Sequence, residues 1–203
     1  TITPTWFSDR NSLTEAQVRY LSSAIGSGEI NGGFSPNDPN YNNKDRKQLE
    51  WLHTVQFNPM VNAKVHWQYL SDKDYWYDLS NSPINTSTTY QQRFANITYN
   101  NSQGLNVELK GQSYQILDPT ITNAQKPYNR IPQLLVDWSK SYPALGSQSV
   151  VIDTHSDIGY FFKPFNSSSE LKDRGMRFSQ QLTSSIPMYS DVGFITPSIG
   201  LSA

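Results

Sequence analysis

The residues best suited to chemistry in this sequence are two aspartates and a histidine that alternate in the last third of the chain. Asp153, His155 and Asp157 stand two positions apart. If a strand runs through them, their side chains share one face of a sheet, where they could hold a metal ion or transfer protons. Their spacing matches no zinc motif, and the same residues also suit the polar end of a strand. We therefore expect no metal site, with Asp153 and His155 as its only candidates.

A second group that could bind a ligand is aromatic. Trp67, Tyr69, Tyr75, Trp76 and Tyr77 gather in one short stretch of the chain. Such side chains can stack on a sugar ring, a base or a partner's side chain, and Tyr and Trp keep a polar group for hydrogen bonding. They serve equally well as packing anchors in a protein with few aliphatic residues. The cluster therefore has a ligand-binding and a structural interpretation.

Other catalytic and cofactor signatures are missing. The sequence has no cysteine, so disulfides, thiolate ligands and cysteine nucleophiles are excluded. It has no Gly-x-Ser-x-Gly turn and no glycine-rich loop that would hold a phosphate ahead of a helix. Paired carboxylates among Asp74, Asp78 and Glu108 stay open, because glycosidases place theirs by fold. We expect a protein that is not an enzyme and needs no cofactor.

Charge and hydropathy limit the possible partners. The chain has 16% charged residues, a net charge of −1 and a mean hydropathy of −0.60. Because no basic block is present, we expect no direct binding of nucleic acid. No run reaches the 18 or so apolar residues of a membrane-spanning helix, and we expect no membrane insertion. The chain starts at Thr1 without a signal peptide, as a processed form or an excerpt would.

The first third of the chain carries helix signals. Residues 12–25 open with the capping-box spacing Ser-Leu-Thr-Glu and end before a glycine, which predicts a helix. Gly, Pro and Asn crowd residues 26–43 and predict a long surface loop. Apolar residues recur at helical spacing over 44–57, where we expect a second helix. Residues 1–58 are therefore predicted to be mainly helical.

Strand signals dominate residues 61–165. Apolar and polar residues alternate over 61–70, which predicts a half-buried strand. Residues 89–99 and 105–117 are rich in β-branched and aromatic side chains, and the turn formers between them predict a hairpin. The segment 149–165 also favours strands. One helix is expected near 131–142, where a proline occupies the first turn, and another over 168–182.

These elements predict one α+β domain over residues 1–203, with N-terminal helices and an antiparallel, sheet-rich middle. The last segment, 183–203, has no period and is expected to form an extended arm. Each large apolar side chain on such an arm gains about 1.5–3 kcal/mol when it is buried on a neighbour. The residues that we expect to serve assembly are Ile186, Met188, Val192, Phe194 and Ile199.

Residues 65–131 resemble a WWE domain, a module that binds ADP-ribose. The resemblance rests on Trp67-Gln68-Tyr69, on Trp76-Tyr77-Asp78 and on the apolar strand pattern that follows. Leu117 departs from the family, which has an acidic residue at that step. The resemblance implies that two tyrosines line a ligand pocket and that an arginine lies near it. With the tryptophans of the aromatic cluster, the predicted ligand-binding set is Trp67, Tyr69, Trp76, Tyr114 and Arg130.

Three functions follow from these patterns. The leading hypothesis is a non-enzymatic structural subunit of a larger assembly, namely a virion protein of a capsid, decoration or tail. A near-neutral charge and an apolar arm favour contacts with other protein subunits in a homo- or hetero-oligomer. The alternative is a binding module for a glycan or ADP-ribose, and the third is a metal-dependent enzyme that uses Asp153 and His155. A virion or extracellular location is expected.

Overall fold

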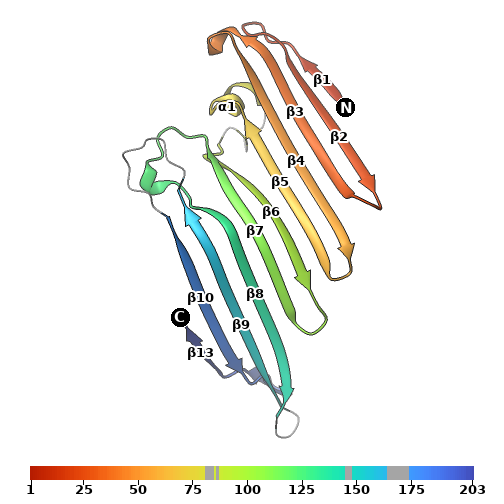
Figure 1. The fold of residues 1–203 in the computed structure, drawn as a ribbon, viewed down its shortest axis with the longest axis vertical. Coiled ribbons are helices and arrows are strands. Elements are labelled where there is room, and N and C mark those ends of the chain that lie inside the picture. Colours follow the sequence, from red (N-terminus) through yellow and green to blue (C-terminus); the bar gives the residue numbers. More distant parts are fainter. Residues whose placement is uncertain (81–84, 86, 145–147, 164–173) are drawn as a thin grey trace.

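The structure is a computed structural model that describes residues 1–80, 85, 87–144, 148–163 and 174–203. One antiparallel sheet of eleven strands dominates these residues (Figure 1). Strands that follow one another in sequence also pair side by side, in the order β1 to β10 and then β13, while β11 and β12 form a separate hairpin. The strands are β1 Ile2–Thr5, β2 Leu13–Ser22, β3 Gly26–Asp38, β4 Lys44–Asn58, β5 Val61–Leu70, β6 Tyr90–Asn100, β7 Leu105–Ile116, β8 Asn129–Pro143, β9 Ser149–Phe162, β10 Arg174–Ser185, β11 Met188–Ser190, β12 Gly193–Ile195 and β13 Ser198–Ser202.

Helical structure within the described residues is confined to short elements. They are the α-helix α1 (Tyr75–Leu79), the 3-10 helices η1 (Pro39–Tyr41) and η2 (Asn123–Gln125), and a helical position at Asn85. No helix in this part of the chain is long and apolar enough to cross a membrane. The predicted α+β class with N-terminal helices is therefore wrong, and the fold is almost entirely β.

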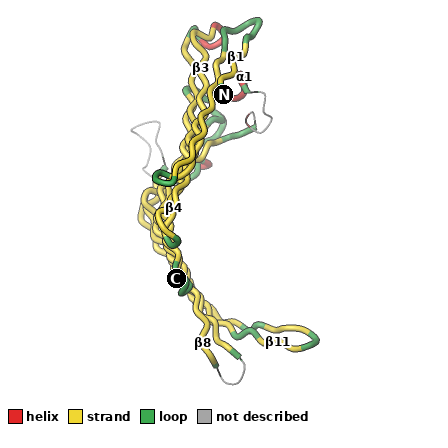
Figure 2. Tube along the Cα trace, turned by 90° about the vertical axis from the view of Figure 1, so that its right-hand side faces the viewer, coloured by secondary structure: helices red, strands yellow, loops and turns green. Residues whose placement is uncertain are grey.

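The two ends of the sheet differ in their connections. At one end, the short-turn end, residues 23–25, 59–60 and 101–104 join neighbouring strands. At the other, the long-loop end, the connections 71–89 and 117–128 are longer, and the first of them contains α1. The side view shows a single curved layer, with α1 and the β11–β12 hairpin on the same side of it (Figure 2).

Both predicted N-terminal helices are strands. In β2, Ala16, Val18 and Tyr20 alternate with polar residues, and in β4, Leu49 and Trp51 do the same. These residues sit two apart, which puts them on one face of a strand but on different sides of a helix. The neighbouring strands complete a hydrogen-bonded ladder with them, as in the pairing of Val18 with Ile30 and of Ile30 with Trp51. Tertiary pairing thus outweighs the local capping signal.

Most of the predicted loop at 26–43 is strand β3. Its glycines turn out to be packing residues. A Cβ at Gly28 would lie 2.2 Å from the hydroxyl oxygen of Tyr20 and 2.6 Å from the carbonyl oxygen of Leu52. A glycine is required there because the Tyr20 side chain lies across the backbone of β3. From composition alone, a glycine at such a position is predicted to lie in a turn.

Some of the remaining predicted elements are confirmed and others are wrong. The predicted helix near 131–142 is strand β8, in which Leu134, Val136 and Trp138 lie two residues apart on one face. The strand over 61–70 and the hairpin of 89–99 with 105–117 are confirmed as β5, β6 and β7. The strand prediction over 149–165 is confirmed for β9. Of the predicted helix 168–182, residues 174–182 belong to β10 and the rest lie outside the described residues.

A small packed core lies beneath α1 at the long-loop end. The helix packs Tyr75, Trp76 and Leu79 against residues of β2 and β5 and of the segments that adjoin the strands. Away from this cluster, large apolar side chains are mostly half-exposed or exposed. The buried apolar side chains are Leu13, Leu70, Tyr75, Trp76, Leu79 and Leu117, with Phe7 packed against them.

A buried ion cluster holds the same region together. The guanidinium of Arg46, at the start of β4, is fully buried and contacts three carboxylates. Its Nη1 lies 3.1 Å from Asp38 and 2.7 Å from Asp78, and its Nη2 lies 2.7 Å from Asp72. Arg10 contributes a second guanidinium, 2.9 Å from Asp38. Because the carboxylates come from β3, α1 and the segment between β5 and α1, Arg46 fastens the helix to the sheet.

The first prediction concerns this cluster. Replacing Arg46 by Met leaves three carboxylates without their shared cation, so we expect a loss of about 3–5 kcal/mol in the free energy of unfolding. Urea titration of the folded protein measures the loss. The control is Arg19→Met, because Arg19 is 71% exposed and pairs only with Glu29. Equal transitions for the two variants would show that the cluster does not hold the fold.

The second prediction uses the phenol of Tyr75. Burial raises the pKa of Tyr75, and its hydroxyl has no hydrogen-bond partner among the described residues. A raised pKa stabilises the fold below the unfolded-state value of about 10, and this contribution is lost as the pH rises above it. We expect Tyr75→Phe to keep or improve stability at pH 8 and to lose less than wild type at pH 11. Urea midpoints at both pH values test this, and parallel losses would contradict it.

Candidate functional site

The strand register sorts the side chains of the sheet onto two contrasting faces. Directly paired residues share a face, and successive residues of a strand alternate between faces. The pairs followed across six strands from β5 to β10 connect apolar residues only. This row contains Ala63, Ile97, Leu109, Leu134, Ile158 and Phe178. We call the side that carries it the apolar face.

The apolar face continues across the first strands. There Val18, Ile30, Trp51 and Trp67 are paired in turn from β2 to β5. These side chains are exposed: Val18 is 57% accessible, and Ile97 in the other row is 50% accessible. No second layer covers them in the described part of the chain. A contiguous apolar surface of this extent marks contact with another protein or with a membrane.

The opposite side, the polar face, carries hydrogen-bonded networks. Gln17 and Asn31 both donate to Glu29, at 2.8 and 2.9 Å, and Asn31 also donates to Glu50 at 3.0 Å. His66 lies 3.0 Å from Glu50 on the next strand. These contacts join four strands, β2 to β5, through side chains alone. Polar groups thus satisfy one another along this face, as they do beside water.

The predicted Asp–His–Asp group lies on the polar face of β9 but does not form a metal centre. His155 Nδ1 is 2.5 Å from Asp137 of β8, and Gln133 donates to Asp157 at 2.9 Å. Among the described residues no three His, Asp or Glu side chains are placed to share a metal ion. Asp153 and His155 share a face because they stand two positions apart in strand β9.

The other carboxylates considered for catalysis have structural partners. Asp78 binds Arg46, Lys73 donates to Asp74 at 3.0 Å, and Asn96 donates to Glu108 at 2.6 Å.

The predicted aromatic cluster is split between three environments. Trp67 and Tyr69 lie on the apolar face, with their rings stacked 6.2 Å apart. Trp76 is buried beneath α1, while Tyr77 of the same helix is 77% exposed. The five side chains therefore do not line one pocket, and the cluster consists of buried packing residues and residues exposed on the surface.

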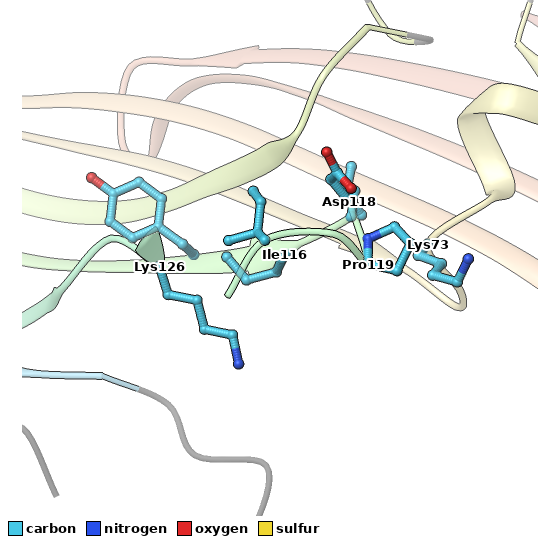
Figure 3. Close-up of a pocket in the computed structure, with 8 residues that line it drawn as sticks. Lys73, Ile116, Asp118, Pro119 and Lys126 are labelled. Atoms are coloured by element: carbon cyan, nitrogen blue, oxygen red, sulfur yellow. The ribbon is translucent and has the colours of Figure 1, made fainter. Parts of the chain in front are cut away.

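Two residues of the predicted ligand set do come together. Tyr114 of β7 and Arg130 of β8 line one cavity of about 700 Å³ at the long-loop end of the polar face. A smaller depression of about 330 Å³ adjoins it and shares Tyr114. Figure 3 shows Lys126 and Lys73 at its two ends, with Ile116, Asp118 and Pro119 between them. Cations therefore gather at this end of the sheet.

The residues predicted for an assembly arm lie in two places. Met188 belongs to β11 and Phe194 to β12, with Val192 in the turn between them. Ile199 lies in β13, opposite Ser184 of β10. The C-terminal segment therefore contains a projecting hairpin followed by an edge strand of the main sheet (Figure 2).

Comparison with known proteins identifies the family. The LPS transport system D family, LptD, matches residues 44–203. The LPS-assembly protein LptD of Acinetobacter baumannii is 33% identical over 202 residues, which are 99% of this chain and 24% of the relative. The chain belongs to the LptD family. It spans about a quarter of the length of the relatives it matches.

Further LptD relatives show similar identity over nearly the whole chain. The LPS-assembly protein LptD of Psychrobacter cryohalolentis is 32% identical over 207 residues, covering 96% of this chain and 20% of the relative. That of Nitrosococcus oceani is 31% identical over 201 residues, covering 99% and 26%. These matches overturn the predicted WWE resemblance, because the LptD family covers all of residues 65–131. They also overturn the virion function and the virion or extracellular location.

Sequence reasoning missed the two faces and most of the cavity. The faces were visible as a period of two in each strand of this LptD-family chain, for example Leu49, Trp51, His53 and Val55 in β4. Helix signals obscured that period. The cavity residues Phe161 and Arg177 gave no signal, because they reach Arg130 only through the pairing of β8, β9 and β10.

Proposed function

We propose that this chain is a membrane-spanning part of an LptD-family transporter that moves lipopolysaccharide into an outer membrane. The apolar face lies against lipid hydrocarbon, and the polar face lines an aqueous path. The rows of exposed apolar residues on one face only carry this proposal. Family membership supplies the substrate, since the relatives are named for LPS assembly. The proposal replaces the expectation that the chain does not insert into a membrane.

Strand geometry supports this role. A membrane-crossing strand needs about 9–11 residues when tilted, and β2 to β10 have 10–15 residues each. Each of these strands has a neighbour on both sides over at least part of its length, and the ladders between β3 and β4 and from β6 to β9 run along most of each strand, which satisfies backbone groups without water. The strands alternate apolar and polar side chains, as outer-membrane strands do. In the described sheet the free edges are β1 with the part of β2 that it leaves uncovered, and β13 with the uncovered part of β10, and in lipid both edges require further strands as partners.

Transport and assembly require no chemical step by this segment. The description of the family names transport. The carboxylates discussed above, such as Asp137 and Asp78, contact neighbouring side chains. A non-enzymatic role is therefore part of the proposal. Contact with other proteins also belongs to it, and the exposed apolar hairpin of β11 and β12 stays the predicted contact surface, with Val192 98% exposed at its turn.

Site-directed spin labelling tests the orientation of the sheet. Because this chain has no cysteine, single cysteines can be placed at positions 94–99 of β6 in the protein reconstituted in lipid vesicles. We expect labels at 95, 97 and 99 to collide with oxygen and labels at 94, 96 and 98 to collide with a water-soluble nickel chelate. A cysteine at Gln103, in the short turn, is the aqueous control. Labels that show no alternation, or the opposite one, would refute the proposed orientation.

A charge placed on each face gives an independent prediction. Ile97→Arg puts a guanidinium on the apolar face, and we expect it to cost about 2–4 kcal/mol if it lies near the bilayer centre. Thr98→Arg is the matched control, since Thr98 pairs with Glu108 on the polar face. Reversible urea unfolding from lipid vesicles measures both. The proposal fails this test if the two substitutions cost the same.

A further inference from the structure

The cavity that contains Tyr114 and Arg130 is formed by four neighbouring strands. Tyr114 comes from β7, Arg130 from β8, Phe161 from β9 and Arg177 from β10, and the cavity measures about 700 Å³. Arg130 is paired with Phe161, and Phe161 with Gly175, so the floor of the cavity is one row of the polar face. This volume lies in the range of small-molecule sites.

Three arginines line this cavity, and none of them has an anionic partner among the described residues. Within the described residues, no ion pair or hydrogen bond joins Arg130, Arg174 or Arg177 to another side chain, and the Nε of Arg130 is buried without an acceptor. The other arginines of the same face contrast with them: Arg46 contacts three carboxylates and Arg19 contacts Glu29. A buried donor without an acceptor lowers stability, and a ligand that supplies an acceptor would remove that cost.

An aromatic surface lies beside these charges. A Cβ added to Gly159 would lie 2.7 Å from the ring of Phe161, so this ring folds back along β9 over the glycine. The guanidinium carbon of Arg130 lies 5.6 Å from the centre of the same ring. Tyr128 also lines the cavity, and the ammonium of Lys163 lies 4.7 Å from the centre of its ring. The cavity thus combines flat rings with cations.

We propose that this cavity binds a phosphorylated sugar. Guanidinium groups match phosphate oxygens with paired, charge-assisted hydrogen bonds, and the flat faces of Phe161 and Tyr128 suit the apolar face of a sugar ring. The site lies on the polar face, which is the side that the proposed function assigns to water. The proposed function also supplies the source of the ligand, namely the headgroup of a phosphorylated glycolipid. The identity of the ligand's source therefore rests on the proposed function.

Binding to the full LptD-family protein in detergent micelles tests the cavity. The probes are the phosphorylated disaccharide trehalose 6-phosphate, the same disaccharide without phosphate, and inorganic phosphate, each titrated by calorimetry. We expect the first to bind most tightly and its affinity to fall as salt rises. Arg130→Gln and Arg177→Gln should each weaken it about tenfold or more, since each removes charged hydrogen bonds. Arg19→Gln, on the same face but paired with Glu29, should leave it unchanged.

The outcomes separate the possible explanations. Equal binding of the disaccharide with and without phosphate would overturn the proposal, and so would equal binding of inorganic phosphate, which would indicate a simple anion site. Wild-type affinity in both arginine variants would also overturn it. If Arg130→Gln does not fold, Arg177→Gln decides, because Arg177 is exposed on β10. Spin labels on β6 in the same protein test the membrane proposal separately, so either can fail while the other stands.

Discussion

The two faces of this single-layered sheet require different surroundings, because one carries apolar and the other polar side chains. This constraint governs the whole structure. In a two-layer protein the apolar face would be buried on another sheet or on helices. Here the rows that contain Ile97, Leu109 and Trp67 stay uncovered, and in water each Å² of apolar surface costs about 25 cal/mol relative to burial. Lipid hydrocarbon, the medium proposed for this face, would remove that cost. The backbone ladder is compatible with it, because every strand from β2 to β10 has a hydrogen-bonded neighbour on each side over at least part of its length.

The same constraint explains where the packed core lies. The buried cluster under α1 sits on the polar side of the sheet at the long-loop end, away from the apolar rows. Because that cluster is small, ion pairs hold much of this region together. Arg46 contacts carboxylates from three segments, and its guanidinium carbon lies 4.5 Å from the ring centre of Tyr41. An ion cluster of this kind would be costly in hydrocarbon. Its position therefore agrees with an aqueous end of the sheet.

Part of this fold was predictable from local sequence and part was not. The strand at 61–70 and the hairpin that follows were found, because their alternation and turn residues agree with the final structure. The strands at 13–22 and 44–58 were mistaken for helices, since a capping spacing and a few apolar residues at helical distance concealed the period of two. In β3 the glycines indicated a loop, whereas Gly28 makes room for Tyr20. Such a role depends on a neighbouring strand and has no local signal.

Two arginines at the same end of the polar face show how stability and binding can be told apart. Arg46 is surrounded by carboxylates, and its environment is complete within the protein. Arg130 lies over Phe161 with a buried Nε that no acceptor reaches, beside two further arginines that no carboxylate neutralises in the described residues. Like charges gathered without counter-charges lower stability, so packing does not account for them. Local features that oppose stability are expected where a protein meets its ligand, and guanidinium groups gathered in one cavity share an affinity for anions.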